Sequence, residues 1–218
     1  AKAKESGKKP GGKPPKPPTA GPKAQDQLNL TDEESRIMPL AGGGFEQAYN
    51  AQAAVDTGSL LVVALGVTQA CNDKEQGVPM LEQLATLPKS LGQAKQLLAD
   101  TGFYSARNAG ACEARGIDPF IAVKQDEHHP APHERFTEPA ALAAEATPAQ
   151  AMAHKLKTNA GRALYALRKQ TVEPVFGIIK SVLGFRQFSL RGLKKVTGEW
   201  TLVCLAWNLK RMAVVRLA

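Results

Sequence analysis

The sequence predicts a mixed α/β fold, and three observations carry this prediction. Short β-forming runs alternate with segments of helical apolar spacing through the first half of the chain. The last third is mostly helical in pattern. Hydrophobic residues make up 43% of the 218 residues, which is enough for a substantial buried core. We therefore expect a mixed sheet flanked by helices.

The N-terminal segment, residues 1–27, is predicted to be a disordered linker. It holds seven lysines and six prolines but no aliphatic β-branched, leucine or aromatic side chain. Apolar burial therefore cannot offset the entropy of ordering it. The linker is either a weak phosphate-binding arm or a connector to an upstream domain. Because the chain begins with Ala1 and not with methionine, we expect a processed or truncated sequence.

Signals of a hairpin follow in the folded part, which we assign to residues 28–218. Residues 49–55 and 60–68 are β-rich runs separated by the turn sequence Asp56-Thr-Gly-Ser. The second run is apolar on both faces, which predicts a strand in the middle of a covered sheet. Before the hairpin, Thr31 has the spacing of a helix or turn cap. The glycines at 42–44 predict a flexible turn, since the Lys-Ser/Thr of a nucleotide loop is missing.

A helix, a strand, a helix and a strand are expected next. Residues 78–91 have helical apolar spacing, and residues 94–99 form a short apolar run that ends at Asp100. A new helix is predicted from Ser105, and residues 117–123 resemble one more buried strand. A carboxylate at the C-terminal end of a strand lies where open α/β sheets bind ligands. Asp100 is therefore a candidate site residue.

The C-terminal part begins as a polar stretch and becomes helical. Residues 124–150 predict a long surface loop ending in an alanine-rich helix. Its histidines could ligate a metal, but they lack nearby cysteines or helical His pairing: His128, His129 and His133. From Ala151 onward we expect helices, the last over residues 194–217. Its predicted core face comprises Trp200, Leu202, Val203, Leu205, Ala206, Leu209 and Met212. Trp200 and Trp207 are expected to pack in the core, with base stacking as the alternative.

Cysteine usage and hydropathy indicate a cytoplasmic protein. The three cysteines, Cys71, Cys112 and Cys204, are widely separated and lack metal-site spacing, so we expect reduced core thiols. The sequence shows neither a secretory leader nor an apolar run of about 18 residues, the length that a membrane span needs. No membrane partner is therefore expected.

The net charge of +8 is distributed unevenly along the chain. Residues 1–27 carry +5, residues 28–153 carry −8 and residues 154–218 carry +11. A charged run on one helix is usually a solvated face. A density of +11 over the last segment instead favours a polyanionic partner, and nucleic acid is preferred over acidic lipid because no basic amphipathic helix is evident.

One carboxylate stands out in the basic segment. Glu173 is the only acid between His154 and Gly198, and it lies on a predicted helix with Tyr165, Arg168 and Lys180. A lone carboxylate among cations either pairs with them or holds a metal ion beside a phosphate backbone. Downstream, arginines alternate with aromatic residues between two glycines, a pattern that suits a loop lying against phosphates; the arginines are Arg186 and Arg191.

Asp100 and Glu173 have the chemistry of a metal-ion pair for phosphodiester cleavage. Such cleavage uses two divalent cations about 4 Å apart, held by a few carboxylates from separate elements. Oxygen ligands suit Mg²⁺, with Mn²⁺ as a substitute. On residue types alone, however, Asp100 could cap the helix at Ser105, and Glu173 could pair with Arg168 or Lys180. Spacing does not decide between these alternatives.

Four segments resemble the C-terminal part of bacterial insertion-sequence transposases of the DDE class. They are GFEQAYNAQAAVD (44–56), VTQACNDKEQ (67–76), LLADTGFYS (97–105) and YALRKQTVEPVFGIIKSVLGFRQFSLRGLKKVTGEWTLVCLAWNLKRM (165–212). The resemblance runs in order over nearly all of residues 28–215. It implies a ribonuclease-H-like fold, here without its first strand. It also implies cutting and rejoining of double-stranded DNA, at transposon ends and target, with three carboxylates and Mg²⁺. It also implies a homodimer in the active assembly, acting at the nucleoid.

The resemblance assigns two of the three carboxylates. The second aspartate of the family falls on Asp100 and the glutamate on Glu173, both as catalytic metal ligands. The family's Tyr-x-x-Arg and Glu-x6-Lys signature falls on Tyr165, Arg168, Glu173 and Lys180. Four residues separate Arg168 from Glu173 where the family has three, and this offset is expected to rotate Arg168 away from Glu173 unless Pro174 bends the helix. Lys180 is thus the better phosphate contact.

The first aspartate of the family has no clear counterpart. No strand with an Asp-Gly/Ser-Thr pattern precedes residues 1–27. Asp56 is the tempting substitute, and Asp73 is a weaker one. We therefore expect Mg²⁺-dependent cleavage and strand transfer to be weak or absent in this chain alone. The alternatives are a DNA-binding remnant without catalysis and, less favoured, a host nuclease of the same fold.

Overall fold

The computed structural model describes residues 21, 28–40, 42–123 and 137–216. The strands are β1 (Arg36–Pro39), β2 (Phe45–Ala48), β3 (Asn50–Val55), β4 (Val62–Thr68), β5 (Gln96–Ala99) and β6 (Asp118–Ile121). The α-helices are α2 (Gly77–Ala85), α3 (Ala106–Glu113), α5 (Pro148–Lys157), α6 (Asn159–Ser181) and α7 (Leu193–Arg216). Two 3₁₀ turns, η1 (Lys89–Leu91) and η2 (Thr101–Phe103), flank β5. The mixed α/β class is confirmed.

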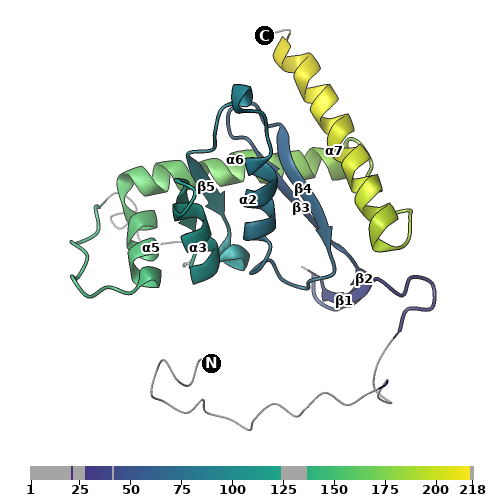
Figure 1. The fold of residues 1–218 in the computed structure, drawn as a ribbon, viewed down its shortest axis with the longest axis horizontal. Coiled ribbons are helices and arrows are strands. Elements are labelled where there is room, and N and C mark those ends of the chain that lie inside the picture. Colours follow the sequence, from purple (N-terminus) through teal and green to yellow (C-terminus); the bar gives the residue numbers. More distant parts are fainter. Residues whose placement is uncertain (1–20, 22–27, 41, 124–136, 217–218) are drawn as a thin grey trace.

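The predicted hairpin is present as the antiparallel pair β3–β4. Its register joins Asn50 to Thr68 at the open end and Val55 to Val62 near the turn. α7 packs along β4, and α6 runs behind β3 (Figure 1). The core between them comprises Val62, Val175, Ile179, Trp200, Cys204 and Trp207. Both faces of β4 are covered, because α2 also contacts it.

The second part of the fold is the parallel pair β5–β6. Gln96 pairs with Asp118 and Ala99 pairs with Ile121. α3 connects the two strands, and it begins where the Ser105 hydroxyl accepts a hydrogen bond from the Asn108 N–H at 3.1 Å. A small cluster of Leu81, Cys112 and Ile117 packs α2 and α3 together. The predicted strand ending at Asp100 and the helix after Ser105 are thus confirmed.

Two helices complete one side of the molecule. α5 begins with a capping box between Thr147 and Gln150 and has Pro148 at its first position, which suits the fixed φ of proline. α6 begins at the Thr158 cap, contacts both β3 and β5, and contains Pro174. No helix in the described part of the chain is long and apolar enough to cross a membrane.

The sheet differs from the ribonuclease-H-like expectation. Instead of one mixed sheet, the described strands form three separate two-stranded sheets, β1–β2, β3–β4 and β5–β6. β4 is therefore covered on its faces but is not the middle strand of a sheet among the described residues. β1 and β2, which the sequence did not predict, pair across the triple glycine, where Gly43 and Gly44 have φ of +88° and +86°. The ribonuclease-H-like arrangement stays a prediction.

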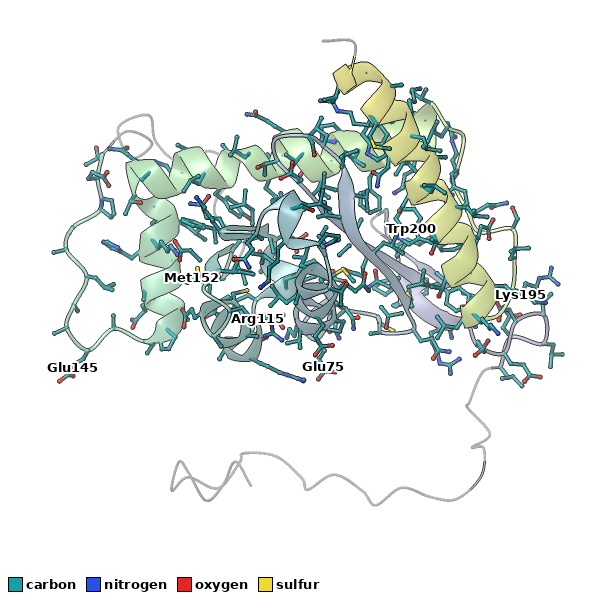
Figure 2. The ribbon with its side chains drawn as sticks, turned by 45° about the horizontal axis from the view of Figure 1, so that its top comes forward. Glu75, Arg115, Glu145, Met152, Lys195 and Trp200 are labelled. Carbon is teal, nitrogen blue, oxygen red and sulfur yellow. The ribbon has the colours of Figure 1, made fainter. Side chains whose placement is uncertain are left out.

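The core face predicted for α7 is partly wrong. Trp200 and Trp207 are buried at 2% and 4% exposure, and they pack as predicted; Trp200 lies between the helix and the strands (Figure 2). Leu202, Leu205, Leu209 and Met212 were assigned to the same face, but they are 46% to 66% exposed. Their spacing is helical, yet it follows the opposite side of the helix from the tryptophans. Residues 1–20, 22–27 and the histidines of the 124–136 stretch lie outside the described residues.

Candidate functional site

Asp100 lies where the sequence predicts it, directly after the last residue of β5. Its backbone is extended, and its Oδ1 accepts a hydrogen bond from the Gly102 N–H at 2.9 Å, which starts the η2 turn. Asp100 therefore does not cap α3, since Ser105 does so itself. The carboxylate is exposed at the C-terminal end of a parallel strand. This is the position at which α/β sheets commonly bind ligands.

A second carboxylate, Asp73, faces the same point. A Cβ added to Gly102 would lie 3.1 Å from Asp100 Oδ1 and 3.1 Å from Asp73 Oδ2. Both carboxylates therefore lie close to the same side of Gly102, where a side chain would crowd them. Asp73 belongs to the segment between β4 and α2, and Asp100 follows β5, so each half of the fold supplies one carboxylate.

Two amides of β3 fix the position of Asp73. The Asn50 Nδ2 and Gln52 Nε2 atoms both donate to Asp73 Oδ1, each at 2.7 Å. Gln52 is 6% exposed, and its backbone carbonyl oxygen accepts a hydrogen bond from Trp200 Nε1 at 2.9 Å. Charge-assisted hydrogen bonds of this kind orient a carboxylate strongly. The core of the hairpin thus holds Asp73 in place.

Asn108, which is 1% exposed, joins the segment that carries Asp73 to the segment that carries Asp100. Its Nδ2 donates to Lys74 O at 2.9 Å, next to Asp73, and to Phe103 O at 2.8 Å, three residues after Asp100. The amide lies so close to α2 that a Cβ on Gly77 would be 2.6 Å from Asn108 Cγ. A glycine is required there, and Asn108 acts as a buried clamp on the loops that carry the carboxylates.

Asp56, the substitute considered for the missing aspartate, lies at the opposite end of the hairpin. Its Oδ2 accepts hydrogen bonds from the Ser59 N–H and the Ser59 hydroxyl, both at 2.7 Å. These bonds lower the pKa of the Asp56 carboxyl because they favour its charged form. β3 spans six residues and Asp56 directly follows it. At a rise of about 3.3 Å per residue, the whole length of the strand separates Asp56 from Asn50. Asp56 closes a turn and lies far from Asp100.

Glu173 is paired with Arg168. Arg168 Nη2 donates to Glu173 Oε1 at 3.1 Å, although the five-residue offset was predicted to rotate the two side chains apart. The offset therefore does not separate the two side chains, and α6 contains Pro174, at which a bend was the exception to that prediction. The Arg168 guanidinium also lies over the Tyr165 ring, 5.7 Å from its centroid. Arg168 is mostly buried and Glu173 is half exposed.

The other predicted DNA contacts are exposed and basic. Lys180 lies in the last turn of α6, and Arg186 and Arg191 lie in the connection to α7; all three are exposed. Within the described part of the chain, no ion pair involves any of them. The aromatics of this connection point inward: Phe185 and Phe188 contact each other with ring centroids 5.4 Å apart. The two arginines of this connection are therefore exposed to solvent, while its two phenylalanines pack against the core.

The arrangement does not form one three-carboxylate cluster. Among the residues that the structure describes, no group of three or more His, Cys, Asp or Glu side chains could hold a metal ion. Asp73 and Asp100 approach one point, whereas Glu173 is engaged by Arg168 on α6. The two buried cysteines are poor ligands and nucleophiles, because burial raises the pKa of Cys112 to about 11 and that of Cys204 to about 12.

Comparison with known families gives a match in the C-terminal part of the chain. Residues 135–213 match the family model of the transposase DDE domain. The match supports a DDE-class transposase C-terminal part in this stretch of the chain. The resemblance drawn from the sequence motifs is confirmed there. Searches among curated proteins and among solved structures gave no match.

The matched part of the DDE domain contains only some of the candidate residues. Glu173, Arg168 and Lys180 lie within residues 135–213, as do the two arginines of the loop before α7. Asp73 and Asp100 precede the match. The structure brings those two carboxylates together through β3, α3 and Gly102, elements that the match does not cover.

Sequence reasoning missed four residues that shape the surroundings of Asp73 and Asp100. They are Asn50, Gln52, Gly102 and Asn108. It also gave little weight to Asp73. One signal was available: Asn50 and Gln52 place two amides on the same side of a predicted strand, two residues apart. Polar amides on a covered strand need a partner, and Asp73 is that partner.

Proposed function

We propose that this chain acts in DNA transposition, through Mg²⁺-dependent DNA strand cleavage and strand transfer at the ends of an insertion sequence. One observation carries the proposal: Asp73 and Asp100 face a common point at the end of β5, beside the C-terminal part of a DDE domain. Substrate DNA at the nucleoid would meet this carboxylate pair, of which Asp100 is exposed and Asp73 is partly buried, and the exposed cations of the C-terminal segment.

The donor set fits Mg²⁺. Asp73 and Asp100 provide hard carboxylate oxygens from two loops, and magnesium commonly takes one or two carboxylates and keeps several waters. Mn²⁺ has similar ligand preferences. Bound there, the ion would supply activation of the attacking oxygen and stabilisation of the leaving one. We include Glu173 as the helix-borne ligand that the family resemblance implies.

The chain's own residues have distinct tasks in this proposal. Asn50 and Gln52 hold Asp73, while Asn108 fixes the spacing between the two loops. Arg168 neutralises Glu173 in the present conformation, and a DNA phosphate would compete for the same guanidinium. Lys180 and the exposed loop arginines then contact the phosphate backbone.

A non-catalytic DNA-binding role is the second candidate, and one observation favours it. The described residues hold no three-carboxylate cluster, and Glu173 is neutralised by Arg168. The segment after residue 153 still carries +11, so DNA binding would persist without chemistry.

Nicking of supercoiled plasmid DNA with Mg²⁺ or Mn²⁺ separates the two functions. We expect Asp100→Asn, Asp73→Asn and Glu173→Gln each to abolish nicking while DNA binding persists. Asp56→Asn is the matched control and should nick at the wild-type rate. Full nicking by Asp73→Asn would remove that residue from the proposal. Salt-sensitive binding without nicking under either ion would establish the non-catalytic role.

DNA contacts are tested by the salt dependence of binding. A double variant, Arg186→Gln with Arg191→Gln, should weaken binding to any duplex sequence and reduce the slope of log K against log salt by about 2. Lys89→Gln, on η1 and far along the chain from the basic segment, serves as the control. An unchanged slope in the double variant would exclude these arginines as phosphate contacts.

A further inference from the structure

The α6–α7 loop, residues 182–192, joins α6 to α7 and carries two of the proposed phosphate contacts. Its phenylalanines, Phe185 and Phe188, pack against the core. Phe188 also meets the ring of Tyr49 edge to face, with the two centroids 6.3 Å apart. These contacts hold the inner side of the loop. The loop has no helix or strand, so its backbone N–H groups need other partners.

Glu199, on α7, binds the backbone in the middle of this loop. Its Oε1 accepts a hydrogen bond from the Ser189 N–H at 2.9 Å, and its Oε2 accepts one from the Leu190 N–H, also at 2.9 Å. Hydrogen bonds to a charged carboxylate are stronger than those between neutral groups. One side chain of α7 therefore fixes the orientation of two successive peptide groups of the loop.

The segment before β1 holds the end of the same loop (Figure 1). Asp32 Oδ2 accepts a hydrogen bond from the Gly192 N–H at 3.2 Å, and Glu34 Oε2 accepts one from the Leu193 N–H at 2.8 Å. The Tyr49 hydroxyl donates to both Asp32 oxygens, at 2.8 and 2.9 Å, and so orients that carboxylate. These bonds satisfy N–H groups at the start of α7 that have no partner within the helix. The start of α7 is thus already occupied by the chain's own carboxylates.

The three carboxylates hold the loop without neutralising its arginines. Arg186 and Arg191 are both exposed, and in the described part of the chain neither forms an ion pair. The neighbouring acids bind backbone N–H groups instead. The guanidinium groups therefore keep their charge and their donors for an external anion, although the loop that carries them is fixed at several points.

We propose that Glu199 is a positioning residue for DNA binding, which fixes the α6–α7 loop so that Arg186 and Arg191 face the phosphate backbone. Asp32 and Glu34 act in the same way at the end of the loop. The inference rests on the proposed function, because it takes the two arginines as phosphate contacts. A preorganised loop loses less conformational freedom when it binds, so more of the contact energy appears as affinity.

The direction of the effect separates positioning from simple electrostatics. Glu199 is negative, and DNA is a polyanion. If the charge of Glu199 acted only at long range, its removal would strengthen DNA binding. If Glu199 positions the loop, its removal weakens DNA binding, because the arginines lose their fixed geometry. The two explanations therefore predict changes of opposite sign.

Fluorescence anisotropy with a short DNA duplex, measured on the 218-residue chain at several salt concentrations, tests this sign. Glu199→Ala should weaken binding and reduce the slope of log K against log salt by about 1 to 2. Glu33→Ala is the matched control, since Glu33 is exposed in the segment before β1 and forms no ion pair among the described residues. The control should bind DNA as wild type or more tightly. Unchanged or tighter binding by Glu199→Ala would overturn the proposal.

A triple variant shows whether Glu199 acts through the arginines. Glu199→Ala added to the double variant of Arg186→Gln with Arg191→Gln should cause no further loss of affinity, because a positioning residue acts only through the groups that it positions. A further loss of about 10-fold in the triple variant would show that Glu199 contributes by another route, and it would overturn the proposal.

Trypsin digestion measures the order of the loop without DNA. Trypsin cuts after arginine, so cleavage after Arg186 and Arg191, followed by mass spectrometry, should be faster in Glu199→Ala than in wild type or Glu33→Ala. Circular dichroism checks that the variant folds, and Asp32→Ala provides a second variant with the same expectation. Equal cleavage in all four proteins would overturn the proposal.

Failure of the inference and failure of the proposed function give different results. A wild-type chain that binds no DNA at low salt would contradict the proposed function, and the positioning role would fall with it. A wild-type chain that binds DNA, with Glu199→Ala binding equally well, would contradict the positioning role alone.

Discussion

The two ends of the β3–β4 hairpin satisfy their polar groups in different ways. At the turn, the Asp56 carboxylate accepts a hydrogen bond from the Ser59 N–H. Side chains of α7 bind the backbone there: Trp207 Nε1 donates to Leu60 O at 2.8 Å, and Arg211 Nε donates to Ser59 O at 2.7 Å. At the open end, amides of β3 hold Asp73 toward Gly102. One carboxylate closes a turn, and the other is presented to a second carboxylate.

This difference shows why two aspartates of similar type have different prospects for chemistry. Asp56 has its hydrogen-bonding partners within three residues, so its role is local and structural. Asp73 is held by residues more than twenty positions away, and its neighbour Asp100 comes from another sheet. A carboxylate fixed by distant amides, beside another carboxylate, is the arrangement that suits a cation.

The largest expected effect is loss of the anchor at the turn end. Trp207→Ala removes a 4% exposed side chain and its hydrogen bond to Leu60 O, so we expect the free energy of unfolding to fall by about 3–5 kcal/mol. Urea unfolding followed by circular dichroism measures it. The exposed Lys194→Ala on the same helix should stay within about 0.5 kcal/mol. A loss below about 1 kcal/mol in Trp207→Ala would show that α7 does not anchor the turn.

The next effect concerns the open end. Gly102→Ala places a methyl group 3.1 Å from Asp100 Oδ1 and from Asp73 Oδ2, so we expect both carboxylates to shift from their present positions. Titration calorimetry should show Mg²⁺ binding weakened about 10-fold or more. In Gly110→Ala, on α3, the added Cβ meets no atom within 4 Å, and binding should be unchanged. Equal Mg²⁺ affinity in the two variants would show that Asp73 and Asp100 do not bind a cation beside Gly102.

Local patterns in the sequence identified most elements near this site, while contacts between distant residues escaped them. The strand before Asp100, the helix after Ser105 and the hairpin around Asp56 each depend on neighbours within a few residues, and all are present. The approach of Asp73 to Asp100 depends on Asn108, which joins two loops across the fold. Such a contact has no periodic signature in the sequence.

The α7 face illustrates a second limit of sequence patterns. Helical spacing shows which apolar residues share a side, but it does not show which side meets the hairpin. Trp200 and Leu202 were placed together because both are apolar, yet the hydrogen bond from Trp200 to Gln52 O turns Leu202 outward. The ribonuclease-H-like sheet likewise depends on strand pairing between distant segments, which local patterns do not encode.

A smaller effect tests the turn carboxylate. Asp56→Ala should lower the free energy of unfolding by about 1 kcal/mol at pH 7, because it removes the bonds to Ser59. The pKa of Asp56 is lowered in the folded protein, so its contribution is complete above the unfolded carboxyl pKa and is lost as pH falls through the folded value. Urea unfolding at several pH values should show the two proteins converging in acid.

The control for this pH series is Glu145→Ala, an exposed carboxylate at the outer loop before α5 (Figure 2). It should stay within about 0.5 kcal/mol of wild type at pH 7. Mg²⁺ binding should be the same in Asp56→Ala as in wild type. A loss of Mg²⁺ binding in Asp56→Ala would contradict the structural role of Asp56 and reopen it as a ligand.

The smallest effect is a difference in thiol labelling between the exposed Cys71, near the open end of the hairpin, and the two buried cysteines. Cys71, two residues before Asp73, is exposed, which corrects the expectation of three core thiols, whereas Cys112 and Cys204 are 1% exposed. Burial raises the pKa of Cys112 to about 11 and that of Cys204 to about 12, so few thiolates form on either at pH 8. A maleimide at pH 8 should therefore modify one thiol per folded chain, and Cys71→Ser should modify none until urea is added. Rapid labelling of a second thiol in the folded protein would mean that α3 or α7 opens far more readily than its packing implies.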